Sequence, residues 1–430
     1  MKNFLKSIIV AIITAEAAFL LRRKQPKIIA VTGSVGKTST KDAIYSAIKN
    51  NTYARKSEKS FNSDIGVPLT VLGLPNGWNN PFLWIRNIVD GFFTAFFARD
   101  YPEVLVLETG FDRPGYMSKL IRWVHPDIVV LTRLPSVPVH VEFFPSPEAV
   151  VAEKMKLVSG MKPDGVLIYN NDDAIVQSQL PDVLQRSVGF GRYLETDITA
   201  REDRIVYRDD LPVGVEFSVF YHNEPYKIFI NDTVGTQHVY SCCAAIAVSN
   251  ELDIPIEEAV GSIQSLKTPN GRMRIIPGLK SSILIDDSYN SSPLAVEQAL
   301  LALQGIAYAK RKIAVLGDML ELGKYSSTEH RRVGTLVPGV ADILFTVGVR
   351  ARQMAEGAMS VGMSEKHIFQ YDDVARAGRE LQALLHPGDV VLIKASQGIR
   401  AERIVEEVMA EPDKAKELLV RHDEDWMKIA

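Results

Sequence analysis

The sequence lacks several features that would assign a protein to a class at once. Its 430 residues include only two cysteines, Cys242 and Cys243, and the net charge is −3. Adjacent cysteines in a helix-like run are poorly placed to pair with each other, so there is no disulfide framework and a cytoplasmic location is favoured. Nearly balanced charge leaves no basic footprint for DNA or RNA, and we expect no nucleic-acid partner.

Long apolar runs are also missing. Residues 8–21 are almost continuously apolar, but this stretch is shorter than the roughly 20 residues of a bilayer-spanning helix, and the basic residues on both sides argue against a secretory signal. Residues 81–97 are rich in Phe. We interpret both stretches as helices packed in cores or against each other. The alternative is a peripheral membrane contact through residues 1–24 and 81–97, at the inner face of the plasma membrane.

Internal repeats and low-complexity segments are absent too, and the length suggests two or three domains. Short apolar strand candidates alternate with helical stretches such as 147–159, which is typical of a parallel, doubly wound α/β sheet. Its strands are predicted at residues 28–31, 104–107, 128–131 and 166–169. Alternation over residues 199–231 predicts an antiparallel excursion of this sheet. After turn residues at 268–271, a second α/β domain is predicted, with strands at residues 283–285, 313–316, 343–345 and 390–393.

The most informative stretch that is present is a phosphate-binding loop between a predicted strand and a helix-compatible segment, residues 41–48. It consists of Thr32, Gly33, Ser34, Val35, Gly36, Lys37, Thr38 and Ser39. The two glycines let backbone N–H groups turn toward phosphate oxygens. The lysine can reach the β- and γ-phosphates, and the threonine hydroxyl after it can bind Mg²⁺. Val31 replaces a further glycine of the usual pattern. The alternative is a glycine-rich turn that happens to carry a lysine.

Polar residues near the ends of the next strands are further candidates, because ligands of open α/β sheets bind at the carboxyl ends of the strands. Glu108 closes one strand and Thr132 closes the next. A carboxylate such as Glu108 suits Mg²⁺. His140, in the following loop, reads more readily as a structural or surface histidine. Lys154, in the next helix, reads more readily as a solvated surface residue.

The order of these motifs resembles the Mur ligase family, over about residues 27 to 410, and within it the MurF type. The resemblance rests on the phosphate-binding loop and on residues 62–70 (NSDIGVPLT), 107–110 (LETG), 140–144 (HVEFF), 170–173 (NNDD), 271–273 (GRM), 285–290 (IDDSYN), 315–323 (VLGDMLELG) and 394–398 (KASQG). It implies a P-loop, doubly wound central ATPase domain at residues 27–269 and a Rossmann-like C-terminal domain at residues 270–430. Residues 1–26 are predicted to form a separate apolar helix.

The same resemblance implies an ATP-dependent acid–amino-acid ligase. In such enzymes a substrate carboxylate attacks the γ-phosphate of ATP, and an amine then displaces phosphate from the acyl phosphate. The implied substrates are a small-molecule or lipid-linked carboxylate acceptor of cell-wall synthesis and D-Ala-D-Ala or an amino acid. Two Mg²⁺ ions are implied. The implied metal-binding residues are Thr38, Glu108, His140 and Lys154, the last as a carbamate, which offers hard oxygens where an ammonium group would repel the ion.

Residue roles follow from the resemblance position by position. The implied catalytic residues are Lys37, His140 and Lys154. Beyond residues 33–39 of the loop, the implied nucleotide-binding residues are Ser241, Arg272, Asp287, Tyr289 and Asn290, with Asp287 at the ribose.

The chain departs from the MurF pattern in several places. Only the apolar segment precedes the phosphate-binding loop, where the family's UDP-sugar-binding domain is expected. Ser241 stands in place of an adenine-binding asparagine, Ser292 in place of Asn and Gln397 in place of Arg. A changed acceptor or amine is therefore an alternative, as in ligases that build poly-γ-glutamate or a cofactor side chain. A nucleotide-binding scaffold without turnover is the alternative from another functional class.

Overall fold

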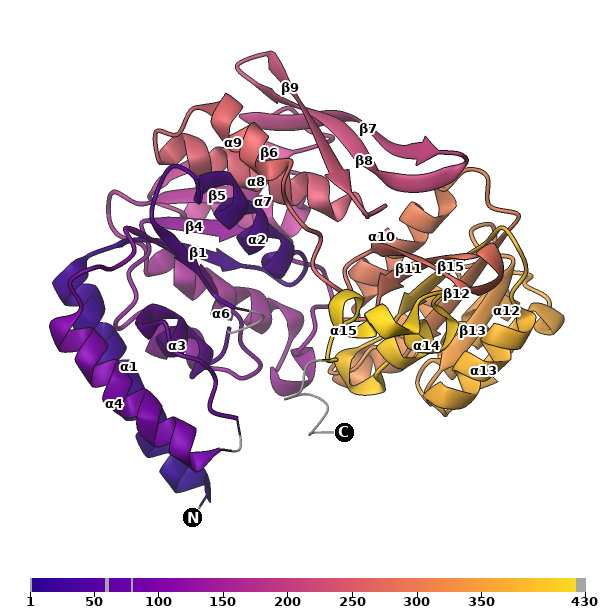
Figure 1. Ribbon diagram of the computed structural model, residues 1–430, viewed down its shortest axis with the longest axis horizontal. Coiled ribbons are helices and arrows are strands. Elements are labelled where there is room, and N and C mark those ends of the chain that lie inside the picture. Colours follow the sequence, from indigo (N-terminus) through magenta and orange to yellow (C-terminus); the bar gives the residue numbers. More distant parts are fainter. Residues whose placement is uncertain (1, 59–61, 79, 423–430) are drawn as a thin grey trace.

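A computed structural model describes residues 2–58, 62–78 and 80–422; residue 1 of the predicted N-terminal helix and residues 423–430 of the predicted C-terminal domain lie outside it. Two sheets, each covered by helices on both faces, follow each other along the chain (Figure 1). The predicted α/β fold class is confirmed.

The first sheet has the strand order β2-β3-β1-β4-β5-β6-β7-β8-β9. Its strands are β1 (Lys27–Thr32), β2 (Ala54–Lys56), β3 (Val104–Glu108), β4 (Ile128–Leu131), β5 (Val166–Asn170), β6 (Arg186–Gly191), β7 (Ile198–Arg208), β8 (Leu211–Tyr221) and β9 (Glu224–Asn231). Pairing is parallel from β2 to β7 and antiparallel from β7 to β9. The predicted strands and the antiparallel excursion are thus confirmed. Because β1 lies between β3 and β4, the ends of these three strands meet at one edge.

Helices bury both faces of this sheet. One face packs against α2 (Lys37–Ile48), α8 (Gln237–Glu251) and α9 (Ile256–Ile263). The other face packs against α3 (Gly66–Leu72), α5 (Tyr116–Leu120), α6 (Pro147–Ser159) and α7 (Ala174–Gln179), together with the N-terminal helix α1 (Lys2–Lys24). Cys242 and Cys243 lie at the centre of α8, both fully buried and both free thiols.

The second sheet has the order β10-β11-β15-β12-β13-β14, parallel except for the edge strand β10. Its strands are β10 (Arg274–Pro277), β11 (Ile283–Asp287), β12 (Arg311–Gly317), β13 (Ile343–Val347), β14 (Ile368–Tyr371) and β15 (Asp389–Lys394). One face packs against α10 (Pro293–Gln304), α11 (Ser326–Gly334) and α12 (Arg352–Ser360); the other packs against α13 (Val374–Leu384), α14 (Glu402–Val408) and α15 (Ala415–Leu418). Ser292 caps α10, since its Oγ accepts a hydrogen bond from the N–H of Ala295 at 3.3 Å.

Helices α1 and α4 (Pro81–Phe97) lie side by side and run in the same direction along one flank of the first sheet, at the lower left of Figure 1. Asn80 caps α4, and Pro81 occupies the first helical position. Gly91 of α4 permits the close approach, because a Cβ there would lie 2.3 Å from Glu16 Oε2. The two helices pack against each other, as one interpretation predicts. No helix in the described part of the chain is long and apolar enough to cross a membrane.

Candidate active site

The phosphate-binding loop joins β1 to α2 in a conformation that only glycine adopts easily. Gly33 and Gly36 have φ values of 137° and 89°. A Cβ on Gly33 would lie 2.0 Å from Thr132 Oγ1, so the loop lies directly against the end of β4. The N–H of Ser34 donates to the carbonyl of Arg133 at 2.8 Å, which fixes this contact. The loop is therefore held between the end of β4 and the N-terminus of α2.

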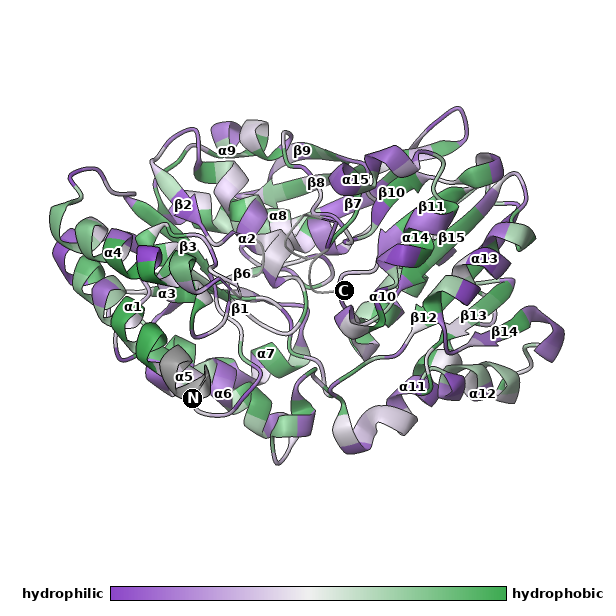
Figure 2. Cartoon of the chain, turned by 60° about the horizontal axis from the view of Figure 1, so that its bottom comes forward, coloured by the Kyte–Doolittle hydropathy of each residue, from purple (hydrophilic) through white to green (hydrophobic). Residues whose placement is uncertain are grey.

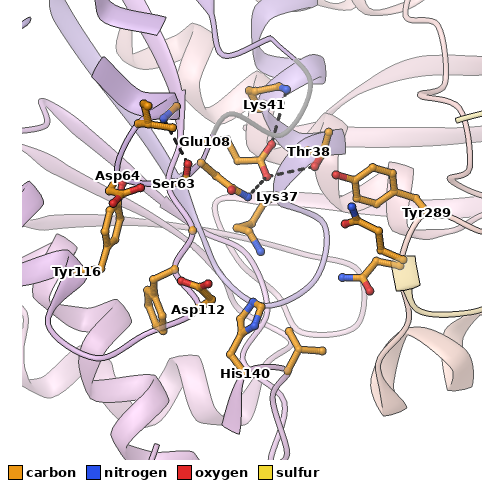
Figure 3. A pocket seen from close by; sticks show the side chains of 18 of the residues that line it. Lys37, Thr38, Lys41, Ser63, Asp64, Glu108, Asp112, Tyr116, His140 and Tyr289 are labelled. Carbon is orange, nitrogen blue, oxygen red and sulfur yellow. Dashed lines mark hydrogen bonds and ion pairs between the residues drawn. The ribbon is translucent and has the colours of Figure 1, made fainter. Parts of the chain in front are cut away.

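A buried carboxylate lies beside the start of α2. Glu108 Oε1 accepts hydrogen bonds from Thr38 Oγ1 at 3.3 Å and from Asn62 Nδ2 at 3.1 Å. Its Oε2 lies 3.6 Å from Lys41 Nζ and has no hydrogen-bond partner. Figure 3 shows the side chains of Thr38, Lys41 and Glu108 gathered above Lys37. The carboxylate of Glu108 at the end of β3 and the hydroxyl oxygen of Thr38 at the start of α2 thus lie next to each other.

These two oxygens fit Mg²⁺. The ion typically takes one or two protein oxygen ligands and completes its coordination with water and substrate phosphates. The buried Oε2 of Glu108 accepts no hydrogen bond and is ion-paired with Lys41 at 3.6 Å, so it could also ligate a cation. Within residues 2–58, 62–78 and 80–422, no group of three or more His, Cys, Asp and Glu side chains is arranged to hold a metal. The donor set suits an ion that is held partly by nucleotide phosphates.

Two lysine side chains lie near the loop, Lys37 partly buried and Lys154 almost fully buried. Burial, with a smaller contribution from Arg272, lowers the pKa of Lys37, while Glu108 opposes the shift. Lys154 is only 3% exposed; its Nζ donates to the carbonyl of Gly33 at 3.0 Å and lies 4.3 Å from the Phe111 ring centre. Burial and the nearby Lys37 hold the pKa of Lys154 well below its usual range. The expectation of a solvated Lys154 is therefore wrong.

His140 links the two halves of the molecule. It has a left-handed backbone (φ 71°) just before a short 3₁₀ turn, Val141–Phe143. Its Nδ1 lies 2.5 Å from Glu321 Oε2, in the loop after β12. This contact lowers the pKa of the Glu321 carboxyl. The N–H of Glu142 also donates to the carbonyl of Glu321 at 3.3 Å, so His140 is oriented from the second sheet.

Further side chains reach the site from the second half of the chain. Arg272 Nη2 lies 3.5 Å from Thr38 Oγ1, and its guanidinium stacks over the Tyr289 ring at 4.3 Å. Asp287, at the end of β11, accepts a hydrogen bond from Lys394 Nζ at 2.5 Å. Burial lowers the pKa of Lys394, which Asp287 opposes. Arg421 donates to the carbonyl of Ser288 at 2.9 Å and so supports the loop that carries Tyr289 and Asn290.

These groups line one cavity of about 1640 Å³ between the two sheets. The predicted site residues on its wall are Ser34, Val35, Gly36, Lys37, Thr38, Glu108, His140, Lys154, Arg272, Tyr289 and Asn290. Ser39, Ser241 and Asp287 are buried behind the wall, and Gly33 contributes its carbonyl to Lys154. Ser241 hydrogen-bonds with Thr40 at 3.2 Å. The cavity continues past the loop to α1, where Ser7, Val10, Ala11 and Thr14 line it.

Sequence reasoning missed the residues that support the site. They are Lys41, Asn62, Glu321, Lys394 and Arg421. Asn62, Glu321 and Lys394 could have been found, because each lies in one of the family-like motifs. Arg421 lies outside those motifs and comes close to the site only through the folding of the second half of the chain.

Comparison with known proteins agrees with this geometry. Residues 88–249 match the Mur ligase middle domain, and residues 271–397 match the domain described as Mur ligase, glutamate ligase domain. The chain belongs to the Mur ligase family. This Mur ligase is 29% identical over 392 residues to the UDP-N-acetylmuramoyl-tripeptide–D-alanyl-D-alanine ligase of Bacillus subtilis, with 90% of this chain and 76% of that protein covered.

Solved structures share the fold. The MurF ligase of Thermotoga maritima in complex with ADP superimposes with a TM-score of 0.75 at 23% identity, covering 98% of this chain and 85% of that one. MurF of Acinetobacter baumannii gives 0.76 at 22% identity, covering 92% and 79%. This Mur ligase is thus a MurF-like, ATP-dependent ligase, and the predicted family, fold class and enzyme class are confirmed.

Proposed function

We propose that this Mur ligase joins D-Ala-D-Ala, or a single amino acid, to the carboxylate of a cell-wall precursor through an acyl phosphate. A UDP-N-acetylmuramoyl tripeptide is the first acceptor to test, since the similar Bacillus subtilis protein is named for it. The observation that carries the proposal is the convergence of Thr38, Glu108 and Arg272 at the N-terminus of α2. Two sheets contribute to one phosphate site there, as a ligase that closes around its nucleotide requires.

In this proposal the loop N–H groups and Lys37 hold the β- and γ-phosphates. Mg²⁺, held by Thr38 and Glu108, would neutralise charge on the transferring phosphoryl group. Arg272, in the connection before β10, adds a cation, and its stacking on Tyr289 fixes the guanidinium plane. The acceptor carboxylate attacks the γ-phosphorus, the bond to ADP breaks, and the amine then attacks the acyl carbon and releases phosphate. Closure of the cavity would keep water from the acyl phosphate.

Lys154 is proposed to act as a carbamate that, with His140, binds a second Mg²⁺. Carbamate formation requires a neutral amine, and the lowered pKa of Lys154 supplies one closer to neutral pH. The carbonyl of Gly33 and the Phe111 ring hold the amine in place. Glu321 would orient the imidazole of His140 toward the same ion.

The remaining nucleotide contacts are also proposals. Tyr289 and Asn290 face the cavity and would meet the adenosine. Asp287 would reach the ribose only if Lys394 released it, and Ser241 would act from behind α2 by holding Thr40. We propose residues 27–269 and 270–430 as the two catalytic domains and residues 1–26 as a separate helix. The enzyme would work in the cytoplasm.

The decisive experiment measures phosphate release from ATP with Mg²⁺. Each assay pairs one acceptor (UDP-muramoyl tripeptide, a lipid-linked precursor or an acidic peptide) with D-Ala-D-Ala or a single amino acid. The proposal expects release, and a ligated product by mass spectrometry, with a muramoyl acceptor only when an amine is present. Turnover with glutamate peptides alone would instead identify a polyglutamate-type ligase. If the protein binds nucleotide but releases no phosphate with any pair, it would be identified as a nucleotide-binding scaffold without turnover.

A further inference from the structure

Helix α4 turns a row of large apolar side chains outward. The exposed members are Phe82, Ile85, Val89, Phe92, Phe93, Phe96 and Phe97. Phe82 is 80% exposed, Phe97 63% and Phe93 57%. Apolar residues scattered singly over a surface are ordinary, but a helix with this many on one side is not.

Helix α1 extends the same surface. Its exposed Ile8, Ile12 and Phe19 lie on one side of the helix, and the Phe19 ring stacks on the Phe96 ring at 4.5 Å. Phe96 in turn lies 4.6 Å from Phe92. The rings therefore touch across the two helices and form one continuous apolar face, here called the α1–α4 face. Figure 2 shows apolar residues along both helices.

The opposite side of α1 is buried against the rest of the protein. Ile13, Ala17 and Leu20 are fully buried against the first sheet and its helices. Arg23 donates to the carbonyl of Ala95 at 2.9 Å, and Lys24 donates to the carbonyl of Arg99 at 2.7 Å, so both helices are tied together at one end. The α1–α4 face can therefore lie on a surface, while the buried side of α1 holds it to the enzyme.

The two segments that form this face carry a net charge opposite in sign to that of the whole chain. Residues 1–24 and 81–99 contain seven basic and two acidic residues, whereas the chain has a net charge of −3. Arg22, Arg86 and Arg99 are exposed. Aromatic and aliphatic side chains combined with basic residues match the boundary of an anionic bilayer, where rings enter the headgroup region and cations meet lipid phosphates. Two copies of such a basic face would repel each other, which disfavours a second copy as the occupant.

We propose that the α1–α4 face docks on the surface of an anionic lipid bilayer. The enzyme lies on the membrane without crossing it, with the side chains of α4 in the headgroup region. Because Ser7, Val10, Ala11 and Thr14 on another side of α1 line the cavity, the docked helix also forms the cavity wall nearest the lipid. The docking itself does not depend on the proposed reaction.

The test is flotation of the full chain with vesicles of phosphatidylglycerol and phosphatidylcholine, compared with vesicles of phosphatidylcholine alone. We expect binding to the anionic vesicles that weakens as salt is added. The double variant F93S/F97S should lower the partition coefficient roughly tenfold or more. The matched control is L184S, which changes a 97% exposed leucine far from the α1–α4 face in sequence and should bind as the unchanged chain does.

Phosphate release in solution, without vesicles, should be unchanged in F93S/F97S and shows that the variant is folded. Three results would overturn the proposal. One is equal binding to both kinds of vesicle, or to neither. Another is a partition coefficient that the double variant leaves unchanged. The third is a concentration-dependent dimer in sedimentation that the double variant abolishes, since it would make the face a contact between copies of the chain.

Discussion

The wall of the cavity and the α1–α4 face depart from the usual distribution of side chains in opposite directions. At the cavity, the ionisable side chains of Lys154 and Glu108 are buried and that of Lys37 is partly buried; at the α1–α4 face, aromatic rings are exposed to water. Each arrangement costs free energy in the isolated chain, and each becomes favourable once a ligand of matching chemistry arrives. The comparison shows that a site for a small molecule and a site for an extended surface differ in which side chains they bury and expose, although both lie in the same half of the chain.

The buried cations of the cavity give the largest expected effect. K37A should lower ATP-dependent product formation by about 10²–10³-fold or more, because a preorganised cation at the transferring phosphoryl group is lost. The melting temperature should not fall, since the change also removes a charge that lowers the pKa of Lys154. Steady-state phosphate release and thermal unfolding measure the two effects.

The control is K49A, at the exposed C-terminal end of the same helix, which should retain full turnover. Normal turnover in K37A would show that the loop does not hold the reacting phosphates.

Variants of Lys154 can distinguish whether the buried group acts as an ammonium cation or as a carbamate. K154A should lose activity by roughly 10²-fold, and short carboxylates such as formate or acetate should restore part of it. K156A, on the exposed side of the same helix α6, is the matched control and should remain active. Absence of rescue, together with no CO₂ adduct in the native mass spectrum, would favour a role as an ammonium group.

Glu16, a partly buried acid where α1 meets α4, gives the smallest expected effect. Burial raises its pKa from 4.5 to about 7, so the folded state favours the protonated form. The stabilising contribution is complete below the unfolded pKa and is lost as the pH rises through about 7. The melting temperature of the unchanged chain should therefore fall relative to that of E16Q as the pH is raised from about 4.5 to about 7, and the difference should stay constant above that.

D90N, which changes a carboxylate at the surface of α4, controls for Glu16 and should keep the pH dependence. If E16Q keeps it as well, another group between the helices is responsible.

The sequence predicted much of the fold because buried parallel strands read as short apolar runs. The runs that became β1, β3, β4 and β5 end within a residue or two of their predicted limits. The phosphate-binding loop was predictable for the same local reason, since Gly33 and Gly36 are required by the backbone itself.

The environment of single side chains was not predictable. Lys154 looks like a surface residue on its helix, and only the folded chain brings the Gly33 carbonyl and the Phe111 ring against it. Ser241 hydrogen-bonds with Thr40 across helices α8 and α2, a contact that the sequence did not predict, and its role toward the nucleotide stays a prediction. Such pairings join distant parts of the chain, and no local pattern encodes them.

The two thiols of α8 can be used to measure how often this part of the core opens. Cys242 and Cys243 are both 0% exposed, and burial raises the pKa of Cys243 to about 12 and that of Cys242 well above its usual range. An alkylating reagent needs an accessible sulfur in the thiolate form, whereas in the native helix both thiols are buried and protonated. The rate at which the unmodified chain is alkylated will therefore report how often α8 separates from the sheet. Mass spectrometry can measure this rate without any substitution.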